Sequence, residues 1–85
     1  MARRDKRFAK ALNNSRGLRF DEFRALVDTF GYRLGRISDS HHIYYHPDVP
    51  SPLNIQPDKN GMAKAYQVHD FLEDVRDYLG DEEAR

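Results

Sequence analysis

Hydrophobic residues recur at helical spacing in two stretches of this chain. In the first stretch they are Phe20, Phe23, Leu26, Val27 and Phe30. In the second stretch they are Val68, Phe71, Leu72, Val75, Tyr78 and Leu79. Steps of three residues, broken by single steps, place each set on one side of a helix with 3.6 residues per turn. The pattern therefore predicts helices over residues 21–30 and 65–79.

The residues that flank these stretches are typical of helix ends. The carboxylate of Asp21 can accept hydrogen bonds from the free backbone N–H groups of a first turn, so we predict Asp21 as an N-cap. Gly31 and Gly80 stand where a helix often closes in a left-handed conformation.

Between the two predicted helices the sequence is typical of extended chain. The predicted strands span residues 32–37, 41–46 and 53–56. The second strand is rich in β-branched and aromatic residues and stops at Pro47, and turn-forming residues stand at 38–40 and 58–61. The order helix, three strands, helix predicts an α+β fold, with two helices on one face of a three-stranded antiparallel sheet.

The chain is long enough for one domain, with short segments at either end. Residues 1–16 are basic and contain few large apolar side chains, so we predict a basic N-terminal arm or a short helix. Residues 17–80 would form the single domain that 85 residues allow. The acidic residues 81–85 are expected to form a frayed tail.

The net charge of zero conceals two halves of opposite charge. Residues 1–36 hold ten Lys or Arg against four acids, giving +6, and residues 37–85 hold four against ten, giving −6. A basic half suggests contact with a polyanion. The chain has no cysteine, which excludes a disulfide framework and a thiolate nucleophile. No apolar run approaches the roughly 20 residues of a membrane span, so we expect a cytoplasmic protein.

The histidines are the candidates for chemistry, and a metal site can be tested first. His42 and His46 are four residues apart, which is a metal-binding spacing on a helix. On the predicted strand four residues span about 13 Å, at roughly 3.3 Å per residue, so the two rings cannot reach one ion. We therefore expect no metal and no other cofactor. Proton transfer remains, because an imidazole titrates near neutral pH and the 2′-hydroxyl of RNA supplies its own nucleophile.

Strand alternation divides residues 41–46 into two faces. If Ile43 packs against the helices, His41 lies on the same covered side, at the end of the sheet. The open face would then be formed by His42, Tyr44 and His46, and such a row could contact RNA. The pattern alone leaves His41 and His42 as equal candidates for the catalytic residue.

The stretch Ser40-His41-His42-Ile43-Tyr44-Tyr45-His46-Pro47 resembles the signature strand of the HicA toxins. In that family Gly-Ser-His is followed, after two residues, by an aromatic residue and often by His-Pro. Residues 17–20 and 30–32 are similar to the opening of one HicA subgroup. Residues 53–57 and 61–68 are similar to its third strand and the start of its last helix. Together these motifs cover about residues 17–79.

The resemblance implies a double-stranded-RNA-binding-like fold of order α-β-β-β-α, the order that the pattern also predicts. It implies a toxin ribonuclease of a type II toxin–antitoxin pair, which cleaves mRNA without a metal through a single histidine and is neutralised by a HicB-type antitoxin. The histidine after Gly-Ser maps to His41, which is the expected catalytic residue. The expected RNA-binding residues are Ser40, His42, Arg36 and Lys64.

One residue departs from the family pattern, because the glycine before Ser-His is Asp39 here. Aspartate tolerates turn and left-handed conformations better than most residues, so we expect the hairpin to survive. Its carboxylate would repel phosphate close to His41, which predicts reduced or lost activity. The alternative hypothesis is a non-catalytic RNA-binding or protein-interaction module on the same fold.

Overall fold

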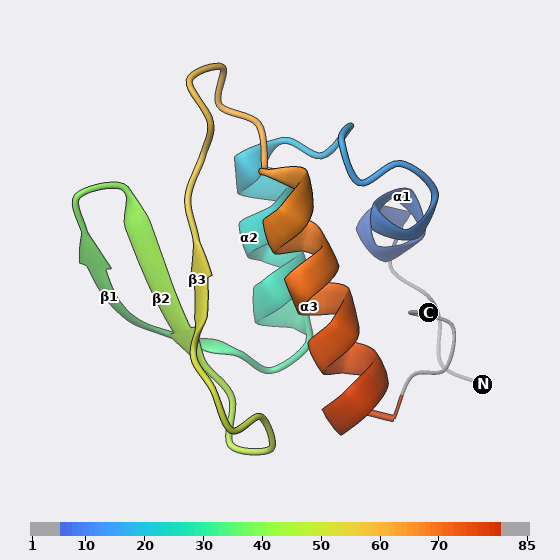
Figure 1. The fold of residues 1–85 in the computed structure, drawn as a ribbon, viewed down its shortest axis with the longest axis vertical. Coiled ribbons are helices and arrows are strands. Elements are labelled where there is room, and N and C mark those ends of the chain that lie inside the picture. The colour runs from blue at the N-terminus through green and yellow to red at the C-terminus, as the bar shows by residue number, and fades with distance from the viewer. Residues whose placement is uncertain (1–5, 81–85) are drawn as a thin grey trace.

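The computed structural model describes residues 6–80 and contains three helices and three strands (Figure 1). The elements are α1 (Lys6–Asn13), α2 (Phe20–Thr29), β1 (Arg33–Ser38), β2 (His41–Tyr45), β3 (Leu53–Ile55) and α3 (Ala65–Tyr78). From α2 onward the order is α-β-β-β-α, which confirms the predicted α+β class. The tail predicted at residues 81–85 lies outside the described residues.

The strands form one antiparallel sheet in the order β1-β2-β3. A tight turn joins β1 to β2, and the register sets Ser38 opposite His41. The pairing of these two strands shifts between Leu34 and Arg36, where Gly35 is the extra residue of a bulge. β2 therefore occupies the centre of the sheet, and its residues His42, Ile43 and Tyr44 are paired on both sides.

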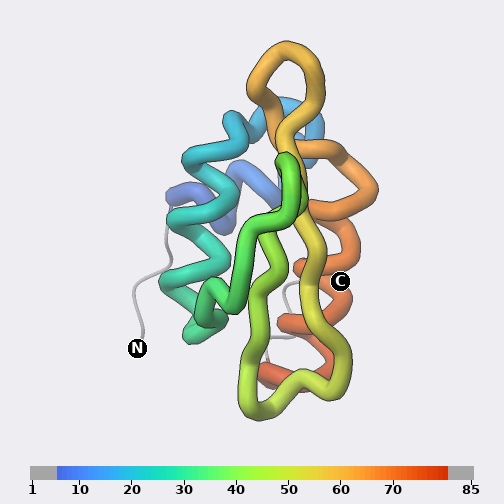
Figure 2. The backbone as a smooth tube through the Cα atoms, turned by 90° about the vertical axis from the view of Figure 1, so that its left-hand side faces the viewer, coloured from blue at the N-terminus to red at the C-terminus, as the bar shows by residue number. Residues whose placement is uncertain are grey.

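The helices lie on one side of the sheet, in two layers (Figures 1 and 2). α2 and α3 cover one face of the sheet, and α1 lies on the far side of these two helices. α1 joins the core through Phe8, which is fully buried with its ring centroid 5.0 Å from that of Phe30. Of the two forms predicted for residues 1–16, the described part therefore adopts the short helix.

Of the three residues predicted to cap helices, the two glycines are confirmed and Asp21 is not. The N-cap of α2 is Arg19 rather than Asp21, because the helix begins earlier than predicted and Asp21 lies inside its first turn. The backbone N–H of Arg19 donates to the Glu22 carboxylate at 2.9 Å, which closes this end. Gly31 and Gly80 follow α2 and α3 with φ of 93° and 76°, the left-handed conformation that was predicted.

The two faces of β2 are the reverse of the predicted ones. Tyr44 is completely buried against α2, where the Arg24 Nε–H donates to its hydroxyl at 3.0 Å. His42 lies on the same side, its ring centroid 4.9 Å from that of Phe20. The expectation that Ile43 faces the helices is therefore wrong. Tyr44 has the larger apolar ring to bury and finds a partner for its hydroxyl, which favours its burial over that of Ile43.

Candidate functional site on the open face of the sheet

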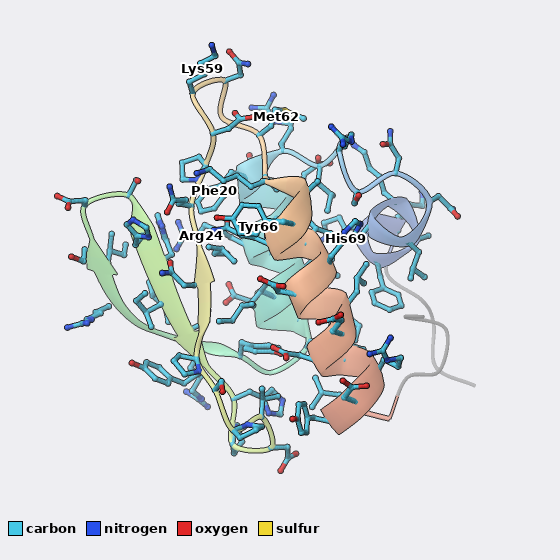
Figure 3. All side chains as sticks on the ribbon, in the orientation of Figure 1. Phe20, Arg24, Lys59, Met62, Tyr66 and His69 are labelled. Atoms are coloured by element: carbon cyan, nitrogen blue, oxygen red, sulfur yellow. The ribbon has the colours of Figure 1, made fainter. Side chains whose placement is uncertain are left out.

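Two of the four histidines, His46 and His69, are poorly placed for proton transfer to a ligand on the sheet. His46 Nε2 lies 3.1 Å from the Phe30 carbonyl oxygen, and its Nδ1 accepts from the Asp48 backbone N–H at 3.0 Å. With both nitrogens engaged, His46 joins the end of α2 to the loop after β2. His69 lies on the side of α3 that faces away from the sheet (Figure 3), and so away from the histidines of β2.

His42 is held on the helix side of the sheet. Its Nδ1 lies 2.9 Å from the Ser40 carbonyl oxygen, and its ring packs edge-on against Phe20 at the start of α2. These contacts join the β1–β2 turn to α2. His42 therefore has a structural role in packing that does not depend on a ligand.

His41 begins β2 on the open face, where its ring is partly buried. Its Nδ1 lies 3.1 Å from Oδ1 of Asn54 on β3. Because an amide oxygen only accepts, this contact sets the hydrogen on Nδ1 and the lone pair on Nε2. Nε2 makes no hydrogen bond within residues 6–80, so it can take a proton from a ligand on this face.

Asn54 is a site residue that the sequence analysis did not predict. It lies 13 positions after His41 and on another strand, so no local motif connects the two. Asn54 pairs with Ile43 across the β2–β3 ladder, which brings its exposed side chain onto the open face. The only sequence signal for this contact is the alternation of β3, since Leu53 and Ile55 on either side are buried.

Of the predicted RNA-binding residues, Arg36 and Ser40 lie near His41. Ser38 is directly opposite His41, and Arg36 is opposite Ile43, one step along the same face. Arg36 is exposed and forms no ion pair with any residue in the described part of the chain. Ser40 is exposed in the turn that leads into β2.

Lys64 is not brought to this face. It is the N-cap of α3, a helix that covers the other face of the sheet (Figure 1). Close to it, the buried Gln67 accepts a hydrogen bond from the Gln56 backbone N–H at 2.9 Å, which joins β3 to α3. The predicted set is therefore divided between the two sides of the sheet, with Lys64 and His42 on the helix side.

Asp39 adopts the left-handed conformation, with φ of 57°. It is the single non-glycine residue with positive φ in residues 6–80. Glycine takes this conformation without steric cost, and aspartate takes it more easily than most other residues. The left-handed backbone of this turn accounts for the glycine at this place in the similar motif. It also tolerates the aspartate that stands here.

The basic residues of α1 do not reach the open face. α1 is separated from the sheet by the layer of α2 and α3 (Figure 1), and Lys10 pairs with Glu22 of α2 at 3.3 Å. The position of this helix therefore gives no support to a contact between its basic residues and a polyanion on the open face. Arg33 and Arg36 of β1 supply the positive charge on the open face instead.

An acidic groove of about 370 Å³ runs between β3 and α3. It is lined in part by Asp70, Glu73 and Asp74. Burial raises the pKa of Asp70, and the neighbouring Glu73 raises it further. Burial also raises the pKa of Asp74, although the Tyr32 hydroxyl donates to this carboxylate at 3.1 Å and opposes the change. Asn54, whose amide oxygen lies 3.1 Å from His41 Nδ1, also lines this groove. The groove therefore borders the candidate site, and its carboxylates would repel a phosphate on the β3 side.

Residues 6–80 contain no group of three or more His, Cys, Asp or Glu side chains that could hold a metal ion. No helix within that range is long and apolar enough to cross a membrane. No family model matches the chain, and no curated protein or solved structure matches it either.

Proposed function

We propose that this protein is a ribonuclease toxin of the HicA type, which cleaves mRNA with His41 as its acid–base residue. The observation that carries the proposal is the His41 ring, which Asn54 holds at Nδ1 and whose Nε2 has no hydrogen bond within residues 6–80. The similarity of residues 40–47 to the HicA signature supports the same residue. The protein would act in the cytoplasm, and a HicB-type antitoxin would neutralise it.

The reaction uses the nucleophile that RNA carries. Nε2 of His41 takes the proton of a 2′-hydroxyl, and the freed oxygen attacks the adjacent phosphorus. The bond from phosphorus to the 5′-oxygen breaks, leaving a 2′,3′-cyclic phosphate on one product and a 5′-hydroxyl on the other once the leaving oxygen has gained a proton. Asn54 supports this step, because its amide oxygen keeps accepting from Nδ1 while the ring becomes positively charged.

Positive charge close to the reacting phosphate comes from β1. Arg36 pairs with Ile43, the residue that follows His41 on the open face, and has no ion pair among the described residues, so its guanidinium is available to a phosphate. A fixed cation stabilises the charge that accumulates on phosphorus in the transition state. No metal is needed for this route.

The first test is RNA cleavage by His41→Ala. We expect its rate to fall by about 100-fold or more, which is the usual loss when a general base is removed. His69→Ala is the matched control, since it removes an imidazole from an exposed position away from the sheet, and its rate should equal that of the wild type. Wild-type cleavage should also be insensitive to a chelator.

A His41→Ala protein that cuts RNA at the wild-type rate would contradict the proposal. Loss of cleavage in His42→Ala together with full activity in His41→Ala would move the site to the helix side of the sheet.

The second test separates positioning from substrate binding at Asn54. Asn54→Ala removes the acceptor for Nδ1 and should lower kcat by about tenfold. Asn54→Asp keeps an oxygen at that place, so we expect kcat to recover while KM rises, because the added negative charge repels RNA. If both variants lose kcat equally, the contact with His41 does not position the ring.

The second candidate function is an RNA-binding module without cleavage, and the observation that favours it is the Asp39 carboxylate in the turn before His41. On this hypothesis the purified protein binds RNA, the affinity falls as salt rises, and no RNA is cut. Denaturing gel electrophoresis of the RNA after incubation distinguishes the two functions.

A further inference from the structure

The open face of the sheet carries positive charge and polar groups but no carboxylate. Strand register places on it Arg33, Arg36 and Ser38 of β1, His41, Ile43 and Tyr45 of β2, and Asn54 of β3. In the part of the chain that the structure describes, no helix covers this face (Figure 1). A polyanion could therefore lie along β1 and β2 without meeting a negative side chain on the strands themselves.

Both arginines of this face are exposed and have no partner in an ion pair within residues 6–80. The described ion pairs of other cations are at Lys10, Arg19 and Arg76. Because Arg33 and Arg36 hold no carboxylate, a phosphate can bind them without first displacing one. Two exposed, unpaired guanidinium groups on one face are complementary in charge to the phosphates of a ligand.

Tyr45 is an aromatic ring held on the same face by the bulge in β1. A Cβ atom placed on Gly35 would collide with the Tyr45 ring, so the ring occupies space that only glycine leaves free. The side chain is nevertheless 49% exposed. One side of Tyr45 is therefore supported by the backbone of the neighbouring strand, while the rest is open to an incoming planar group.

We propose that this face binds single-stranded RNA, with a base stacked on Tyr45 and phosphates on Arg33 and Arg36. This inference rests on the proposed function, whose reacting group is His41 on the same strand. Stacking on an exposed tyrosine requires an unpaired base, so the occupant is a single strand rather than a duplex. Tyr45 and His41 are four residues apart, about 13 Å along the strand, which separates the stacked base from the cleaved bond.

Binding is measured by fluorescence anisotropy with a short fluorescein-labelled oligouridine, in the His41→Ala background so that the probe is not cut. Adding Tyr45→Ala should weaken binding by about 5- to 100-fold, the range for loss of one base–aromatic stack. Tyr78→Ala is the matched control, because Tyr78 is also 49% exposed but lies on α3. Equal affinities for these two variants would overturn the role of Tyr45.

The arginines have a separate readout in the salt dependence. For single strands the slope of log K against log salt concentration is about −0.7 for each neutralised phosphate. Arg33→Gln with Arg36→Gln should therefore flatten the slope by about 1.4. Lys59→Gln, which removes a cation at the tip of the loop before α3 (Figure 3), should leave it unchanged. An unchanged slope in the double arginine variant would overturn the inference.

Two further results separate this inference from the proposed cleavage. If the wild type cuts no RNA but the variants lose binding as expected, cleavage fails and the RNA surface stands. If RNA is cut and the Tyr45 and arginine changes leave binding intact, the surface is overturned and cleavage stands. Tighter binding of an RNA duplex than of the single strand would also overturn the inference. Circular dichroism melts confirm that each variant is folded.

Discussion

Asp39 affects the candidate site through both its conformation and its charge. With φ of 57° it sits in a region where most non-glycine residues are strained by about 1 kcal/mol or more. It also places a carboxylate in the turn between Ser38 and His41, the two residues paired at the end of the β1–β2 ladder. A phosphate that reaches His41 therefore meets one negative charge close by.

We predict that Asp39→Gly raises the rate of RNA cleavage by about two- to fivefold, because one charge a few ångströms away in water contributes up to about 1 kcal/mol. Its free energy of unfolding should change by less than about 1 kcal/mol, since relief of strain is offset by the greater freedom of glycine in the unfolded chain. Asp39→Asn is the matched control, because it removes the charge and keeps the tolerance for positive φ. Unchanged cleavage in both variants would show that the carboxylate does not affect the reaction.

α1 is the element whose role is least evident from its composition. Four of its eight residues are charged or polar, namely Lys6, Arg7, Lys10 and Asn13. The helix nevertheless packs on the core through Phe8 and Ala11, which are both buried. The Phe8 ring lies against Phe30, whose ring in turn lies 5.4 Å from that of Phe71. The helix thus extends the aromatic core of α2 and α3 on the side away from the sheet.

We expect Phe8→Ala to lower the free energy of unfolding by about 3–4 kcal/mol, the usual cost of deleting a buried phenylalanine ring. In a domain of this size each kcal/mol corresponds to about 4–8 °C in Tm, so the midpoint of a thermal melt should fall by more than about 10 °C. Leu12→Ala provides the comparison, because Leu12 is only partly buried beside the same core and its loss should be smaller. A Tm for Phe8→Ala within a few degrees of the wild type would mean that α1 does not contribute to the core.

At the scale of the whole molecule, charge is separated between two surfaces. The open face of the sheet has Arg33 and Arg36, and the groove between β3 and α3 has Asp70, Glu73 and Asp74. The pKa of Asp70 is raised by burial and by the charge of the neighbouring Glu73, so in the folded protein its ionised form is less stable than in the unfolded chain. This carboxylate therefore destabilises the fold at neutral pH. The penalty disappears as the pH falls through its raised pKa toward the ordinary value of aspartate.

Asp70→Asn should consequently raise the free energy of unfolding at pH 7 by about 0.5 kcal/mol, the size of like-charge repulsion between residues three and four apart on a helix. At pH 3 the wild-type carboxyl is protonated in both states, and the two proteins should melt at the same temperature. Asp77→Asn should behave in the opposite way, because its hydrogen bond with Arg76 lowers the pKa of Asp77. A gain from Asp70→Asn that persists at pH 3 would show that its cause is not the charge.

The sequence by itself determined the elements from α2 onward and their order, and it left residues 1–16 open between a basic arm and a short helix. The spacing of Phe23, Leu26 and Val27 predicts a helix, because a 3.6-residue period collects these side chains on one side. Gly31 and Gly80 end their helices for an equally local reason, the absence of a Cβ. The motif at residues 40–47 was likewise visible without a fold, since it needs only neighbouring residues.

The tertiary structure alone decided which face of β2 is covered and what surrounds His41. Strand alternation separates His41 from His42 but is symmetric between the two faces, so the choice depends on whether Tyr44 or Ile43 packs better against α2. The contact of His41 with Asn54 depends on how β3 pairs with β2, and the position of Lys64 on how α3 lies on the sheet. These are pairings between residues distant in the chain, which arise only when all the layers pack together.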